Sequence, residues 1–86
     1  MREQQMEVKL DRKNTSFKEL IDIIDTVGGY PVVARDFDGT LLTIIYKETE
    51  ESTCCVLLEP GTDETGTIKT YYYEDGRVEQ ICMNQQ

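Results

Sequence analysis

The sequence predicts an α+β fold in which one amphipathic helix packs on an antiparallel β-meander of about five strands. Apolar residues recur with the helical period of about 3.6 up to Gly28-Gly29, and they alternate with a period of two beyond it. Short connections, two of which contain Asp-Gly, separate the later apolar runs. With 86 residues, the chain is expected to form a single domain over residues 1–86.

Residues 16–27 are expected to form the helix. Ser16 and Glu19 have the spacing of a capping box, in which each side chain satisfies the backbone N–H of the other residue. Gly28-Gly29 ends the helix, because glycine adopts the left-handed C-terminal conformation without strain. One helical face collects the apolar residues Phe17, Leu20, Ile21, Ile24 and Val27.

The segment Tyr30–Tyr46 is expected to form a hairpin around Asp38-Gly39, since Asp-Gly between β-branched runs strongly favours a tight turn. A two-residue turn places Arg35 opposite Leu42 and Val33 opposite Ile44. Side chains alternate between the two faces of a strand. The face expected to contact the core then consists of Val33, Phe37, Leu42, Ile44 and Tyr46.

Three further strands are expected at 53–59, 67–73 and 77–83, with the first of them central because it is apolar on both sides. A second two-residue turn at Asp75-Gly76 places Thr70 opposite Ile81, and Glu74 opposite Arg77. Alternation of Met6, Val8 and Leu10 with charged residues indicates a short edge strand. Parallel pairs are not expected, because no crossover helix is evident, and residues 1–5 and 84–86 are expected to fray.

Composition narrows the possible functions. The net charge of −8 disfavours direct nucleic-acid binding, which requires a basic surface. The sequence shows neither an apolar run long enough for a membrane helix nor the apolar core of a signal peptide, which favours a cytoplasmic location. Three cysteines without histidine make a disulfide framework, a zinc site and a Cys-His nucleophile pair poor interpretations. We therefore expect no catalytic residue, cofactor or metal ligand.

One short motif carries a possible chemistry. The run Asp36-Phe37-Asp38-Gly39-Thr40-Leu41 resembles the DxDGT signature of the haloacid dehalogenase-like phosphatases. The resemblance implies Asp36 as nucleophile, Asp38 as general acid/base and a bound magnesium ion. It covers six residues, and the chain lacks the long parallel sheet and the later acidic motifs of that family. A hairpin turn accounts for the same residues, so the turn is the preferred interpretation.

The acidic residues are expected to gather at the two ends of the meander, because alternate loops lie at the same end. One end collects Asp36, Asp38, Glu59, Asp63 and Glu64, and the other collects Glu48, Glu50, Glu51, Glu74 and Asp75. The simplest interpretation is a set of solvated turns. The functional hypothesis is that one cluster imitates the charge of a nucleic-acid backbone and binds a basic groove on another protein. The candidate partner-binding residues are Glu48, Glu50, Glu51, Glu74, Asp75 and Tyr72, the last because exposed tyrosines are good interface anchors.

The predicted function is therefore a small acidic protein-interaction module, and its specific form is an inhibitor that blocks a basic nucleic-acid-binding surface on its target. In size, charge and α+β make-up the chain is similar to small acidic phage-encoded inhibitors, including many anti-CRISPR proteins, although no motif carries that likeness. The alternative is a homodimeric structural protein that pairs through the edge strand Arg77–Met83. In that case Tyr72, Ile81 and Met83 are expected to form an outward apolar patch.

Overall fold

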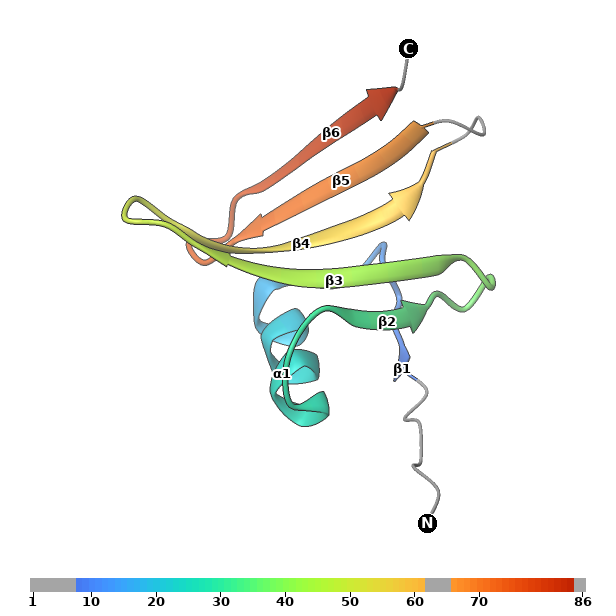
Figure 1. The fold of residues 1–86 in the computed structure, drawn as a ribbon, viewed down its shortest axis with the longest axis horizontal. Coiled ribbons are helices and arrows are strands. Elements are labelled where there is room, and N and C mark those ends of the chain that lie inside the picture. Colours follow the sequence, from blue (N-terminus) through green and yellow to red (C-terminus); the bar gives the residue numbers. More distant parts are fainter. Residues whose placement is uncertain (1–7, 62–65, 85–86) are drawn as a thin grey trace.

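The computed structural model describes residues 8–61 and 66–84 and shows one helix packed on a six-stranded sheet (Figure 1). The strands follow one another in the sheet in the order of the chain, and every pair except β1–β2 is antiparallel. This confirms the α+β class, with six strands where about five were expected. The elements are β1 (Val8–Lys9), α1 (Phe17–Val27), β2 (Val32–Arg35), β3 (Leu41–Glu48), β4 (Thr53–Pro60), β5 (Gly66–Tyr73) and β6 (Val78–Asn84).

The parallel pair β1–β2 corrects the expectation that parallel strands are lacking. Val8 lies opposite Ala34, and the N–H of Leu10 donates to the carbonyl of Arg35 at 3.0 Å. The helix α1 is itself the crossover that parallel pairing requires, because a short strand precedes it. At the other end of the chain, β6 begins at Val78 and ends at Asn84, so it has the expected length of seven residues and lies one residue later than expected. Met6, the segment 1–5 and residues 85–86 lie outside the described residues.

The helix begins and ends where the sequence predicts. The Ser16 hydroxyl accepts a bond from the Glu19 N–H at 3.3 Å, whereas the Glu19 carboxylate accepts from the Thr15 hydroxyl at 3.1 Å. The Ser16 cap is therefore present, and the side chain of Glu19 is bonded to Thr15 instead of to the backbone of Ser16. Gly28 ends the helix with φ of 101°, in the left-handed region that favours glycine.

The hydrophobic core lies between α1 and one face of β2–β5. Leu20 and Ile24 are the buried helical residues, and Ile23 also packs against the core, whereas Val27 is 40% exposed at the end of the helix. Val27 was therefore wrongly assigned to the apolar face, and Ile23 was missed. The sheet contributes Val32, Ala34, Leu42, Ile44, Cys55, Leu57 and Tyr72 to the core.

Both Asp-Gly hairpins have three-residue loops where two-residue loops were predicted. The N–H of Asp36 donates to the Thr40 carbonyl at 2.9 Å, and the N–H of Gly39 donates to the Asp36 carbonyl at 2.9 Å. The same two bonds close the second loop, from Tyr73 to Arg77 and from Gly76 to Tyr73. A two-residue type I′ turn requires the residue before glycine to adopt a positive φ, and among the described residues only glycines do so.

The longer loops shift both registers by one residue. Arg35 lies opposite Leu41, and Thr70 lies opposite Gln80. Because side chains alternate, a shift of one residue moves a strand's side chains to the other face of the sheet. Val32 and Ala34 are consequently buried, whereas Val33 is 60% exposed. Phe37, also predicted to face the core, lies in the loop and is 71% exposed.

The sheet face opposite α1 carries apolar residues on several strands, and we call it the open face. Cross-strand register places Val33, Leu41, Ile45, Val56, Leu58, Tyr71, Ile81 and Met83 on it. Val56 is buried at its centre on β4, whereas Ile81 and Met83 on β6 are 41% and 47% exposed. Together with the buried Cys55 and Leu57 on the helix side, this confirms that β4 is central and buried on both faces.

Candidate functional site

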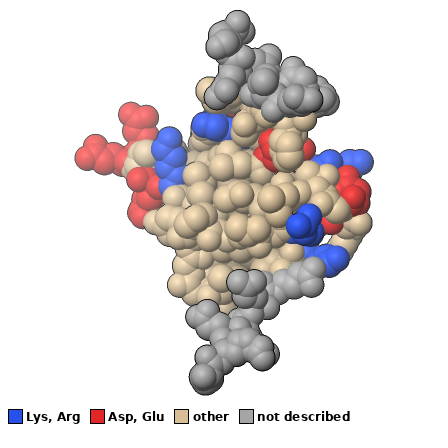
Figure 2. Space-filling model, turned by 45° about the vertical axis from the view of Figure 1, so that its right-hand side comes forward, with Lys and Arg blue, Asp and Glu red and all other residues tan. Residues whose placement is uncertain are grey.

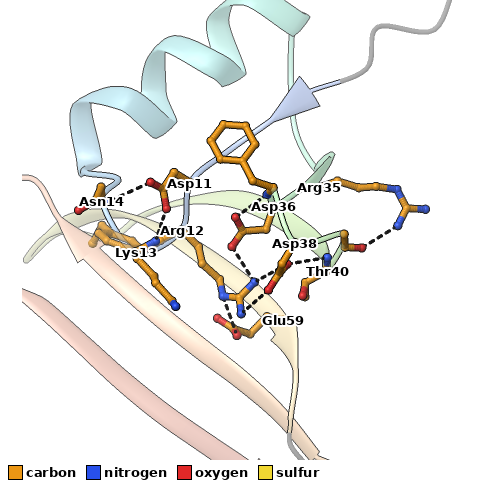
Figure 3. A network of polar contacts seen from close by, with 12 residues as sticks. Asp11, Arg12, Lys13, Asn14, Arg35, Asp36, Asp38, Thr40 and Glu59 are labelled. Atoms are coloured by element: carbon orange, nitrogen blue, oxygen red, sulfur yellow. Dashed lines mark hydrogen bonds and ion pairs between the residues drawn. The ribbon is translucent and has the colours of Figure 1, made fainter.

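Three carboxylates surround the guanidinium of Arg12, which lies in the connection between β1 and α1 (Figure 3). An Nη atom contacts the Asp36 carboxylate at 2.6 Å, Nε contacts Glu59 at 3.3 Å, and the second Nη contacts Asp38 at 3.4 Å. The side chains of Arg12, Asp36 and Glu59 are only 19%, 8% and 14% exposed. We call these four residues the Arg12 cluster.

The Arg12 cluster ties together parts of the chain that are distant in sequence. Asp36 and Asp38 belong to the β2–β3 connection, Glu59 belongs to β4, and the hydroxyl of Tyr72 on β5 donates to the carbonyl of Arg12 at 3.4 Å. Burial disfavours the charged guanidinium, but Glu59, Asp38 and Asp36 outweigh it, so the pKa of Arg12 is raised. One cation therefore contacts all three carboxylates, which is typical of a structural ion-pair network.

The same contacts show what the two aspartates of the Asp-x-Asp-Gly-Thr run do in this structure. Asp36 accepts the N–H of Phe37 at 2.6 Å, and Asp38 accepts the N–H of Thr40 at 2.9 Å, which lowers the pKa of Asp38. Both aspartates therefore stabilise the turn and pair with Arg12, on an antiparallel sheet. Among the described residues, no group of three or more His, Cys, Asp and Glu residues is arranged to hold a metal ion.

The grouping of Asp36, Asp38 and Glu59 at one end of the sheet is confirmed, while Asp63 and Glu64 lie outside the described residues. Arg12 was not among the residues that the sequence indicated as functional. Arg12 is separated from Asp36 by 24 positions, and no local pattern links the two residues.

At the opposite end of the sheet lie the five carboxylates Glu48, Glu50, Glu51, Glu74 and Asp75, which we call the acidic end. All five residues are exposed. The β3–β4 and β5–β6 connections bring them together, and the N–H of Glu74 donates to the Thr53 carbonyl at 2.9 Å. In Figure 2, most of the visible acidic side chains lie at the left and right margins of the molecule, with a broad face of other residues between them.

A surface cavity of about 350 Å³ opens at the acidic end, lined in part by Glu51, Tyr73, Glu74, Asp75 and Arg77. Arg77 pairs with Asp75 at 3.1 Å and lies over the ring of Tyr73 at 4.3 Å from its centre. Hydrogen bonds from the Arg77 backbone and side chain lower the pKa of Asp75. Both members of this ion pair are well exposed, at 65% and 63%, so the contact is screened by water.

Two carboxylates of the acidic end act on the same hydroxyl. The Tyr46 hydroxyl donates to the Glu48 carboxylate at 3.3 Å. Burial raises the pKa of Tyr46 first, and the charges of Glu48 and Glu74 raise it further. Glu48 and Glu74 therefore both lie near the Tyr46 hydroxyl, although they belong to different hairpins.

Tyr72 does not lie on the surface with the other candidate partner-binding residues. It is 7% exposed, and its ring belongs to the core on the helix side of the sheet, away from Ile81 and Met83. The proposed outward patch of Tyr72, Ile81 and Met83 is therefore wrong, and Tyr71 shares the open face with the other two. The one-residue register shift explains the error, because the predicted pairing placed Thr70 opposite Ile81.

The three cysteines are free thiols, of which Cys54 and Cys55 are buried and Cys82 is exposed. Cys54 lies on the open face, but Lys47 and Tyr73 flank it in the register and it is 4% exposed. Burial raises the pKa of the Cys55 thiol to about 11, so this thiol stays protonated near neutral pH.

No family model, curated protein or solved structure matches the chain. Within the described residues, no helix is both long and apolar enough to cross a membrane. The functional interpretation therefore depends on the geometry and the charge of the surfaces described above.

Proposed function

We propose that this protein is a small, non-catalytic interaction module whose acidic end binds a basic surface on another protein in the cytoplasm. The observation that carries the proposal is the gathering of five exposed carboxylates at one end of the sheet, where Glu51, Glu74 and Asp75 line a surface cavity. In its specific form, the module is an inhibitor that covers a nucleic-acid-binding surface, with carboxylates in place of backbone phosphates. It binds no nucleic acid directly, since its net charge is −8.

The acidic end supports this proposal better than the Arg12 cluster does. At the Arg12 cluster, the guanidinium already contacts three carboxylates at 2.6–3.4 Å, and a partner's cation would have to displace it. At the acidic end, the only ion pair among the described residues is Asp75–Arg77. Glu48, Glu50, Glu51 and Glu74 therefore keep their charge available for a basic partner.

The cavity gives the acidic end a shape as well as a charge. Carboxylates of Glu51 and Glu74 lie at its wall, and the Tyr73 ring already supports the guanidinium of Arg77. An arginine or lysine side chain of the partner can enter such a cavity and contact carboxylates and an aromatic ring together. This recognition mode favours a partner with arginine-rich or lysine-rich protrusions, as nucleic-acid-binding enzymes have.

Two double variants test the proposal because they change the net charge by the same amount. Glu50→Lys with Glu51→Lys alters the β3–β4 turn, whereas Asp22→Lys with Asp25→Lys alters exposed positions on α1. Both variants and the wild type are immobilised and exposed to a bacterial lysate, and the retained proteins are identified by mass spectrometry.

We expect a basic nucleic-acid-binding protein that is retained by the wild type and by the helix variant, lost with the turn variant and eluted by salt. If the two double variants lose that protein equally, the interaction follows net charge alone and the acidic end is not the site.

A further inference from the structure

The two edges of the sheet differ in how well they resist pairing with another strand. β1 has two residues, whereas β6 has seven, and in residues 8–61 and 66–84 no strand pairs with the outer side of β6. Edge strands are usually protected by proline, lysine, a bulge or short length. The β6 sequence VEQICMN has neither proline nor lysine, and Glu79 is its one charged residue. β6 is therefore a long and poorly protected edge.

The outward backbone groups of β6 follow from its pairing with β5. The N–H of Tyr73 donates to the Arg77 carbonyl at 2.9 Å, so these two residues form a hydrogen-bonded pair. Hydrogen-bonded and non-hydrogen-bonded pairs alternate along antiparallel strands. The N–H and C=O groups of Glu79, Ile81 and Met83 therefore point towards β5, and those at 78, 80, 82 and 84 point towards the free edge.

Three large apolar side chains of β6 are also exposed to solvent. Val78 is 60% exposed on the helix side of the sheet, and Ile81 and Met83 are 41% and 47% exposed on the open face. An edge with free backbone groups and apolar side chains on both faces is suited to β-strand addition. A second strand would satisfy the backbone and bury these side chains in one step.

We propose that the occupant of this edge is a second copy of the chain, whose β6 pairs antiparallel with the first around a two-fold axis at Ile81. Residues that lie opposite each other in an antiparallel pair project their side chains to the same face of the sheet. A two-fold axis perpendicular to the sheet therefore passes between the two copies of one residue. The register centred on Ile81 places 78 opposite 84 and 80 opposite 82, and it uses all seven residues of the strand. Two six-stranded sheets then become one continuous sheet.

Charge is compatible with pairing of two copies and favours their antiparallel arrangement over a parallel one. In this register Glu79 lies opposite Met83 of the second copy, so no like charges face each other across the strands. The Glu74–Asp75 loop of each copy lies beyond one end of β6, and antiparallel pairing sends the two loops to opposite ends. At about 3.4 Å per residue the loops are separated by more than the Debye length of about 8 Å, whereas parallel pairing would place them side by side.

Oligomeric state in solution is the first test. Light scattering on the wild-type protein should give twice the chain mass of 9.9 kDa. Ile81→Lys places two ammonium groups at the axis and should yield a monomer, while Val33→Lys, on the same face but distant from β6, should remain a dimer. A wild-type monomer at about 100 µM, or a dimer that survives Ile81→Lys, would overturn the proposal.

Crosslinking tests the register even if Ile81→Lys fails to fold. In a Cys82→Ser background, Ile81→Cys should form an intermolecular disulfide with oxidised glutathione, because non-hydrogen-bonded antiparallel pairs bring Cα atoms to about 4.5 Å. Met83→Cys in the same background should not, since its neighbour across the axis is Glu79. A disulfide at position 83 with none at position 81 would contradict the register.

Discussion

The Arg12 cluster and the acidic end contain similar side chains at opposite ends of one sheet, and they differ in what surrounds the carboxylates. In the Arg12 cluster, the Arg12 side chain is 19% exposed and its guanidinium contacts three carboxylates, two of which belong to half-buried or buried residues. At the acidic end, five carboxylates are exposed, and Arg77 pairs with one of them. The first arrangement holds loops together, and the second leaves most of its negative charge exposed to solvent.

This difference shows that the number of acidic residues at one end of a sheet does not by itself indicate a binding site. Asp36, Asp38 and Glu59 would look as suitable as the acidic end if Arg12 were ignored. All three instead contact one cation of the same chain, and these contacts connect the β1–α1 connection, the β2–β3 turn and β4. Compensation by partners within the fold separates the structural cluster from the candidate interface.

The largest expected effect on stability comes from removing Arg12. Arg12→Leu leaves Asp36 and Glu59 in a poorly solvated site without a counter-ion, so the free energy of unfolding should fall by about 2–3 kcal/mol in urea denaturation. The matched change at the other end is Arg77→Leu, where both partners are more than half exposed and the loss should be much smaller. Equal losses in the two variants would show that the two regions do not differ as described.

Acid should weaken the Arg12 cluster. The pKa of Asp38 is lowered in the folded protein, first by hydrogen bonds to Thr40 and then by Arg12, relative to its ordinary value of 3.8. A lowered folded-state pKa contributes stability above the unfolded-state value, and the contribution is lost as pH falls through the folded-state value. Unfolding followed by circular dichroism from pH 6 to pH 2 should show a flatter decline below about pH 4 for Asp38→Asn than for the wild type. Parallel curves would exclude Asp38 from the acid response.

The smallest expected effect on stability belongs to the acidic end. Glu50→Lys with Glu51→Lys should leave the midpoint of urea denaturation nearly unchanged or slightly raised, because neither side chain forms a described contact and the change relieves like-charge repulsion. A clear loss of stability would show that these residues support the fold, as the Arg12 cluster does.

Thiol labelling verifies that such variants keep the native packing. At pH 8 one thiol, Cys82, should react with iodoacetamide in the folded protein, and all three should react in denaturant. Cys54 and Cys55 are buried, and a pKa of about 11 leaves Cys55 almost entirely protonated at that pH. Labelling of more than one thiol in the folded wild type would contradict the burial of this pair.

The sequence predicted those parts of the fold that depend on local patterns. The bounds of α1 follow from Ser16, the apolar period and Gly28, and the central place of β4 follows from its two apolar sides. The registers could not be predicted as reliably, because Asp-Gly fits both a two-residue and a three-residue loop. Only the backbone shows that Asp38 and Asp75 keep a negative φ, and this single choice decides that Val32, not Val33, contacts the core.

The candidate site, like the fold, could be predicted from the sequence only in part. The meander order alone brings the β3–β4 and β5–β6 loops together, so the residues of the acidic end could be grouped from the sequence. Arg12 could not be placed, since its contacts with Asp36 and Glu59 depend on how the β1–α1 connection crosses the sheet. The burial of Tyr72 was missed for a related reason, because it depends on which face of β5 the helix covers.

The measurement that tests the central claim most directly is the salt dependence of affinity for the partner retained in the pull-down. Titration of that partner should show wild-type affinity falling at least tenfold between about 50 mM and about 300 mM salt. The Asp22→Lys, Asp25→Lys protein should follow the wild-type line, and the Glu50→Lys, Glu51→Lys protein should bind more weakly with a flatter dependence. Affinity that is insensitive to salt, or that both double variants weaken equally, would contradict a binding site at the acidic end.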